Sequence, residues 1–187
     1  MIRGMRANWF IALPVSPSPW FTPLMATLPA SCRAFSPSDL HMTVAFLGGI
    51  DAERAPCLTA LLEQVDASPL TACPGPLLAL PSPQKCSALS LSLHEGRDEA
   101  VQLIARWRDL FHDAAGVARD LRPPLPHITV ARPIRKFGAE GRQAAATWYQ
   151  QLVVPHITLN LNRIALYTWA EDRPIHQFRI VAEKCFG

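Results

Sequence analysis

Histidine and threonine recur together at three places in the chain. The stretches LHMTVAFL at 40–47, LPHITVAR at 125–132 and VPHITLNL at 154–161 each contain a histidine, an apolar residue, a threonine and a second apolar residue. In a β-strand, successive side chains point to opposite faces, so an imidazole and a hydroxyl two residues later share one face, about 7 Å apart. Each copy therefore predicts a strand with an imidazole and a hydroxyl on one face and apolar side chains facing the core.

Two such strands, facing each other across a cleft, could perform acid–base chemistry on a phosphate. Hydrolysis of a phosphodiester requires a base for the attacking water, an acid for the leaving oxygen and stabilisation of charge on the phosphate oxygens. Imidazole can act as base or acid near pH 7, and threonine hydroxyls can donate hydrogen bonds to phosphate. Because imidazoles would handle both protons, this chemistry would need no metal and no other cofactor. A single copy also fits an ordinary strand with a hydrogen-bonded histidine, so the pattern alone leaves open which copies act.

The spacing of apolar residues predicts the elements that position these strands. Helix 98–116 is the clearest, with apolar side chains along one face and Gly116 as its stop. The Pro-rich stretch 16–30 predicts only a short, irregular helix or a loop, and no regular element is predicted in the Pro-punctuated segment 69–83. The other predicted elements are strands at 8–15, 40–49, 86–93, 125–132, 156–169 and 176–186 and helices at 51–65 and 139–152.

This order of strands and helices is typical of an α+β fold. His41 and His127 lie nearly half the chain apart, as two similar halves would produce. A chain of 20.6 kDa has the size of one ordinary domain, and no linker indicates a second. We therefore expect a single domain over 1–187, with residues 1–7 as a flexible basic tail.

Composition favours a soluble protein of the reducing cytoplasm. Apolar residues make up 49% of the chain and charged residues 18%, and no stretch of eighteen apolar residues could span a bilayer. The start MIRGMRANWFIALPV has basic residues before an apolar run, as a signal peptide does, but the run is short and ends at Pro14, which favours a buried strand. The five cysteines are scattered without a Cys-x-x-Cys pair, which favours reduced thiols.

The charge balance suits an anionic ligand. The net charge is +3 and the pI about 8.7. The chain lacks the dense Lys/Arg stripe of a protein that follows a duplex, so any contact with nucleic acid would be local, at an end or a single phosphate.

The motifs resemble those of the 2H phosphoesterase superfamily, which is named for two His-x-Thr/Ser-x motifs. Within it, the chain is most similar to the RNA 2′,3′-cyclic phosphodiesterase family, historically called 2′-5′ RNA ligases. The likeness covers FIAL near the start, LHMTVAFLG, PHITVAR and IALYTW near the end. It implies a bilobal α+β fold with pseudo-twofold symmetry, in which two antiparallel sheets form a central cleft and helices lie outside.

The resemblance also implies a reaction and roles for residues. The reaction would be hydrolysis of a terminal RNA 2′,3′-cyclic phosphate to a 2′-phosphate, without metal, on RNA ends or a small nucleotide. Apart from the resemblance, we expect a monomer that binds no membrane. His41 would donate a proton to the leaving oxygen and His127 would be the base on water. Thr43, Thr129 and Arg132 would hold the phosphate.

The flanking residues distinguish the three copies. The family's first motif is followed by Phe-Leu-Gly, as at 46–48, and its second is preceded by proline and often followed by arginine, as Pro126 and Arg132 are here. His156 has neither environment, and we interpret it as part of an ordinary strand with a polar outer face. Ala45 stands where a basic residue often follows the first motif. The site would therefore depend more on arginines, for which Arg33, Arg122 and Arg132 are candidates, and on aromatic residues that could stack a base, namely Phe46, Tyr167 and Trp169.

We weigh three other functions against the residues. A related 2H enzyme could act on a 2′-5′ linked oligonucleotide or a cyclic nucleotide, by hydrolysis or ligation, with the same two histidines. A non-catalytic protein could bind the phosphate of an RNA end, although arginine or lysine would serve more simply. A metallohydrolase is disfavoured because His-x-Thr-x offers no second ligand at metal spacing and no adjacent carboxylate.

Overall fold

The computed structural model describes residues 6–154, 156–173 and 176–187. Most of the predicted tail at 1–7 lies outside the described residues. The helices are α1 Phe21–Met25, α2 Ala55–Leu62, α3 Arg97–Ala115 and α4 Gly138–Gln151. The strands are β1 Asn8–Pro14, β2 Cys32–Ala34, β3 His41–Gly49, β4 Leu70–Leu80, β5 Ala88–Glu95, β6 His127–Pro133, β7 Leu159–Leu161, β8 Arg163–Trp169 and β9 Phe178–Cys185.

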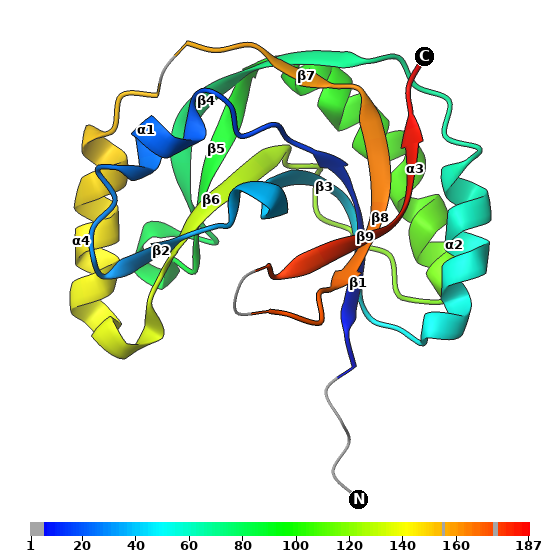
Figure 1. Ribbon diagram of the computed structural model, residues 1–187, viewed down its shortest axis with the longest axis horizontal. Helices are drawn as coiled ribbons and strands as arrows, with labels where there is room; N and C mark the ends of the chain where they lie inside the picture. Colours follow the sequence, from blue (N-terminus) through cyan, green and yellow to red (C-terminus); the bar gives the residue numbers. More distant parts are fainter. Residues whose placement is uncertain (1–5, 155, 174–175) are drawn as a thin grey trace, which may run out of the picture.

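The strands form one strongly curved antiparallel sheet (Figure 1). Their order is β7-β4-β5-β6-β3-β1-β8-β9, and β2 pairs with β6. The resemblance implied two separate sheets, and this detail is wrong. The two motif strands, β3 and β6, are neighbours, and the pairing of Met42 with Ile128 joins the two halves into a single sheet.

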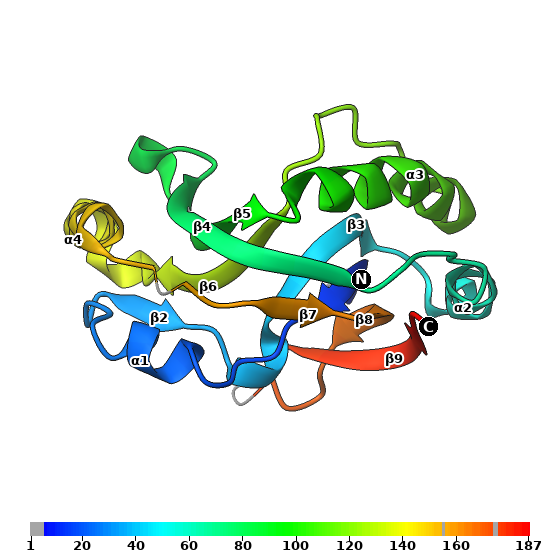
Figure 2. The same cartoon turned by 90° about the horizontal axis from the view of Figure 1, so that it is seen from above.

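Each half of the sheet has its own helices. Helices α2 and α3 lie beside the half that contains β3, β8 and β9, and α1 and α4 lie beside the half that contains β4, β5 and β6 (Figures 1 and 2). One large core runs between sheet and helices through both halves. A much smaller apolar cluster of Phe10, Ala12, Ala165 and Tyr167 is separate from it, on β1 and β8.

Helix α3 confirms the strongest helix prediction. Its buried residues Ala100, Ile104, Trp107 and Phe111 follow the three-to-four spacing of one helical face. Asp98 and Glu99 lie in its first turn, where acidic side chains favour the helix dipole. The helix ends at Gly116, whose φ of +69° is readily adopted by glycine. Helix α4 is also found where predicted, whereas α2 is shorter than 51–65 because residues 52–54 form a 3₁₀ turn.

Strand β4 occupies the segment in which no regular element was predicted. Its sequence, LTACPGPLLAL, contains Pro74 and Pro76, which cannot donate to a ladder. The β4–β5 register shifts on both sides of Pro74, so that the ladder passes the proline-containing stretch and resumes at Leu77. The prolines therefore interrupt the pairing locally without ending the strand.

The predicted strand 156–169 is divided. Regular structure begins only at Leu159, and the short strand β7 pairs with β4, while β8 pairs with β1 and β9.

Among the helices of the described residues, none is both long and apolar enough to cross a membrane.

Candidate active site

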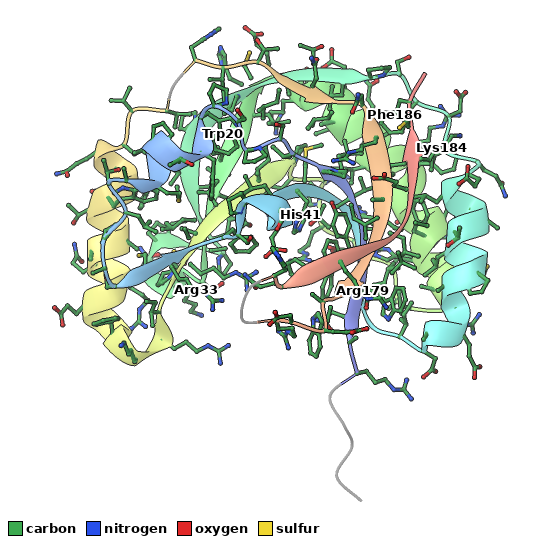
Figure 3. All side chains as sticks on the ribbon, in the orientation of Figure 1. Trp20, Arg33, His41, Arg179, Lys184 and Phe186 are labelled. Atoms are coloured by element: carbon green, nitrogen blue, oxygen red, sulfur yellow. The ribbon has the colours of Figure 1, made fainter. Side chains whose placement is uncertain are left out.

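The first two copies of the motif lie side by side at the centre of the sheet. Met42 and Ile128, which are fully buried, face each other across β3 and β6. An antiparallel register with this pair opposed places His41 opposite Thr129 and Thr43 opposite His127 on the other face. The sheet thus brings together two imidazoles and two hydroxyls, and Figure 3 shows His41 near the centre of the molecule.

Both imidazoles are held in the same way by the backbone. Nδ1 of His41 donates a hydrogen bond to the carbonyl of Asp39 at 2.6 Å, and Nδ1 of His127 donates one to the carbonyl of Leu125 at 2.7 Å. A carbonyl can only accept, so Nδ1 carries a hydrogen in each ring. Nε2 is therefore the nitrogen at which either histidine can gain or lose a proton.

Aromatic rings surround His41. The ring centroid of His41 lies 4.7 Å from that of Phe10, 5.6 Å from Tyr167 and 5.5 Å from Phe178. Loss of hydration among these rings lowers the pKa of His41 from 6.5 to about 4. The bond to the Asp39 carbonyl acts in the opposite direction, and the positive charges of His127 and Arg132 lower the pKa further. His41 is therefore neutral near pH 7 in the free protein.

A β-bulge occurs at the same place in both motif strands. The register between β1 and β3 leaves Val44 as an extra residue on β3, and that between β5 and β6 leaves Val130 as an extra residue on β6. Strict alternation would turn the fifth residue after each histidine to the opposite face, but one extra residue returns it to the histidine's face. That fifth residue is Phe46 in the first copy and Arg132 in the second.

Arg132 belongs to a group of three arginines. It pairs with Arg33 across β2 and β6, and its guanidinium carbon lies 5.1 Å from the ring centroid of Phe35. Burial lowers the pKa of Arg132, and repulsion from Arg33 and Arg135 lowers it further. Within the described part of the chain, none of these three arginines is within salt-bridge distance of a carboxylate. This end of β6 is therefore a place where an anion would relieve repulsion.

A cavity of about 560 Å³ extends from the motif strands toward the loop before β6. Thr43, Phe46 and His127 line it, together with Arg122 and Leu125 from that loop. The cavity is large enough for a nucleoside. It joins one motif histidine to an exposed aromatic ring.

The comparisons with known proteins identify the fold. Neither a protein-family model nor a curated protein matches the sequence. Among solved structures, E. coli LigT complexed with NADP+ superposes with a TM-score of 0.71 at 17% identity, covering 98% of this chain and 99% of that one. LigT complexed with 3′-AMP gives 0.71 at 18% identity over 96% and 98% of the two chains. A protein of Thermus thermophilus gives 0.65 at 18% over 96% and 97%.

The chain has the LigT fold. The curved antiparallel sheet and its helices account for the match over nearly the whole length of both chains. The α+β class inferred from the order of elements is thereby confirmed, and the resemblance of the motifs led to the same fold.

Within this LigT fold, the three proposed stacking residues differ in exposure, and Phe46 is the most accessible. Phe46 is 57% exposed and lines the cavity. Tyr167 is 2% exposed and its ring stacks on Phe10 at 4.9 Å, so its proposed role is wrong. Trp169 is covered by the guanidinium of Arg173, 3.9 Å from its ring centroid.

Arg122 lies where a candidate arginine of the site should, whereas His156 does not lie in the strand that the sequence predicted. Arg122 lines the cavity, but its guanidinium is paired with Asp120 at 2.6 Å. His156 is exposed and precedes β7 rather than lying in a strand. It lies close to Cys73 and Glu95, and Glu95 is three residues along β5 from Ser92, the partner of His127.

Asp39 is a positioning residue that the sequence analysis missed. Its carbonyl accepts from His41, and its carboxylate, 1% exposed, accepts from the backbone N–H groups of Gln177 and Phe178 at 2.9 and 3.2 Å. One residue thus fixes both the imidazole and the start of β9. The only hint in the sequence is an aspartate after Ser-Pro-Ser, which is typical of a turn. Ser90 is a second such residue, because its buried hydroxyl bonds that of Thr129 at 3.0 Å.

Replacement of Asp39 by alanine should destabilise the protein by about 2–4 kcal/mol, because two backbone N–H groups lose their acceptor. We expect urea unfolding to show this loss. The matched control is Asp51→Ala, which removes an exposed carboxylate paired with Arg6 at 3.2 Å and should cost less than about 1 kcal/mol. Equal midpoints for the two variants would contradict the anchoring role of Asp39.

Proposed function

We propose that the protein hydrolyses terminal RNA 2′,3′-cyclic phosphates to 2′-phosphates, as a phosphoric diester hydrolase that uses two histidines as acid and base. The observation that carries this proposal is the pair of adjacent motif strands, in which each imidazole is held through Nδ1 and leaves Nε2 for proton transfer. Two imidazoles with Nε2 available could flank one phosphorus and supply the base and the acid that an in-line displacement uses on its opposite sides.

The reaction would proceed in one displacement. Water attacks phosphorus as one imidazole takes its proton at Nε2, and the bond to the 3′-oxygen breaks as the other imidazole donates a proton to that oxygen. Thr43 and Thr129 would donate hydrogen bonds to the non-bridging oxygens, and Arg132 would balance their charge. Because His41 is neutral near pH 7 in the free protein, it is better suited to start as the base than as the acid that the resemblance implied.

The surroundings of the pair support a nucleotide substrate. Phe46 offers an exposed aromatic face in the cavity that His127 also lines, and Arg33, Arg132 and Arg135 form a basic group at the end of β6. The LigT fold is consistent with this choice, since E. coli LigT has been crystallised with 3′-AMP and with NADP+.

The test is an assay with an RNA oligonucleotide that ends in a 2′,3′-cyclic phosphate, in the presence of EDTA. We expect turnover to a product that co-elutes with the 2′-phosphate standard rather than the 3′-phosphate standard. Turnover only of 2′-5′ linked RNA or of a cyclic nucleotide would assign a different substrate. Binding of the oligonucleotide without turnover would indicate an RNA-end binding protein rather than an enzyme.

A further inference from the structure

The third His-x-Thr copy lies beside a cysteine and a glutamate. Cys73 on β4 and Glu95 on β5 are opposite each other in the ladder, and the Cys73 thiol donates to Glu95 Oε2 at 3.2 Å. The pairing of β4 with β7 brings Thr158 next to Cys73. The Cys73 sulfur, a Glu95 oxygen and a His156 ring nitrogen all lie within 4.8 Å of one another.

The three side chains differ in how far they can move. Cys73 is 3% exposed and is fixed within the sheet, whereas Glu95 and His156 are exposed. Tetrahedral zinc has ligand bonds of about 2.0–2.3 Å, so its ligand atoms lie roughly 3.3–3.8 Å apart. Rotation of two exposed side chains is enough to bring the observed spacing to that value. The arrangement is a fixed thiol with two adjustable ligands.

A reactive thiol is a poorer interpretation of this cluster. The hydrogen bond to Glu95 raises the pKa of Cys73, and burial raises it further, so the thiol is protonated in the absence of a metal. A nucleophilic or redox-active cysteine needs the opposite shift and access for a partner. A bound cation would displace the thiol proton and would neutralise the carboxylate that now accepts it.

We propose that Cys73, Glu95 and His156 bind one divalent transition-metal ion, with zinc the best fit. A thiolate, an imidazole and a carboxylate form a mixed set of ligands that suits zinc, and water would complete the tetrahedron. The thiol proton is released to solvent on binding. The site is separate from the motif pair, because Glu95 lies about 10 Å along β5 from Ser92, the residue paired with His127. The proposal does not depend on the proposed function.

Cobalt titration of the full-length, tag-free protein tests this site. After removal of metal by chelator, one equivalent of Co²⁺ should give a near-ultraviolet thiolate-to-cobalt charge-transfer band, and one equivalent of Zn²⁺ should abolish it. We expect Cys73→Ser to lose the band. Glu95→Gln and His156→Ala should weaken cobalt binding by about tenfold or more. Circular dichroism checks that each variant is folded.

The chain supplies matched controls. Cys57 and Cys185 are exposed free cysteines outside the cluster, and Cys57→Ser and Cys185→Ser should bind cobalt as the wild type does. His94→Ala removes an exposed imidazole next to Glu95 in sequence and should have no effect. The proposal is overturned if the wild type gives no band, if the band persists in Cys73→Ser, or if folded Glu95→Gln and His156→Ala bind cobalt like the wild type.

Discussion

Alanine at His41 or at His127 is expected to reduce kcat for hydrolysis of an RNA 2′,3′-cyclic phosphate by about 10²–10⁴-fold. Each substitution removes one of the two side chains proposed to transfer a proton, while the strand and its buried neighbours Met42 and Ile128 remain. Steady-state kinetics in EDTA measure the effect, with His94→Ala as a control that removes an exposed imidazole.

The same two variants can separate the acid from the base. A nitrophenyl phosphodiester has a leaving group that needs no proton, so the variant that lacks the acid should recover activity on it, and the variant that lacks the base should not. We expect recovery in His127→Ala, because His41 is neutral near pH 7 and can accept the proton of water. Recovery in His41→Ala would reverse the roles. Loss of turnover in folded His156→Ala, with turnover kept in His41→Ala, would mean that the wrong copies had been chosen.

The acid limb of the pH profile should lie near pH 4, well below the ordinary histidine value of 6.5. A two-histidine pair works only while it holds a single proton, so kcat/KM falls once both rings are protonated. The lowered pKa of His41, about 4, sets this second protonation in the free protein. Below it, kcat/KM should fall about tenfold per pH unit. An acid limb centred near the ordinary histidine value would contradict the lowered pKa.

The aromatic surroundings of His41 give this prediction a matched pair of variants. Phe178→Ala admits water beside His41, weakens the desolvation and should move the acid limb upward by about one pH unit. Phe46→Ala removes an aromatic ring that does not contact His41, so it should leave the limb in place even if KM changes. Equal shifts in the two variants would exclude desolvation by these rings as the cause.

The motif histidines and threonines were predictable from sequence because their shared face depends on a short-range regularity. The two-residue period of a strand places histidine and threonine on one face without any knowledge of tertiary structure. The resemblance then selected the first two copies, and the structure places those two on neighbouring strands. Helices with a complete apolar face, such as α3, were predictable for the same reason.

What the sequence did not reveal depends on contacts between distant segments. The aromatic rings around His41 come from β1, β8 and β9, so no local sequence pattern indicates the lowered pKa of His41. The convergence of Cys73, Glu95 and His156 needs the pairing of β4 with both β5 and β7. Strand β4 was missed because its prolines mimic a loop, and the shifts in register that accommodate them are set by the partner strand.

The duplicated bulge would influence the orientation in which a substrate of the proposed kind binds. If both halves of the site were identical, a ligand could dock in two orientations related by a half-turn, and only one would present the correct oxygen to the acid. The equivalent positions differ, with an exposed aromatic ring at Phe46 and a cation at Arg132. An RNA end is itself asymmetric, with a base on one side and a charged backbone on the other. The two residues would therefore favour one orientation of such a substrate over the other.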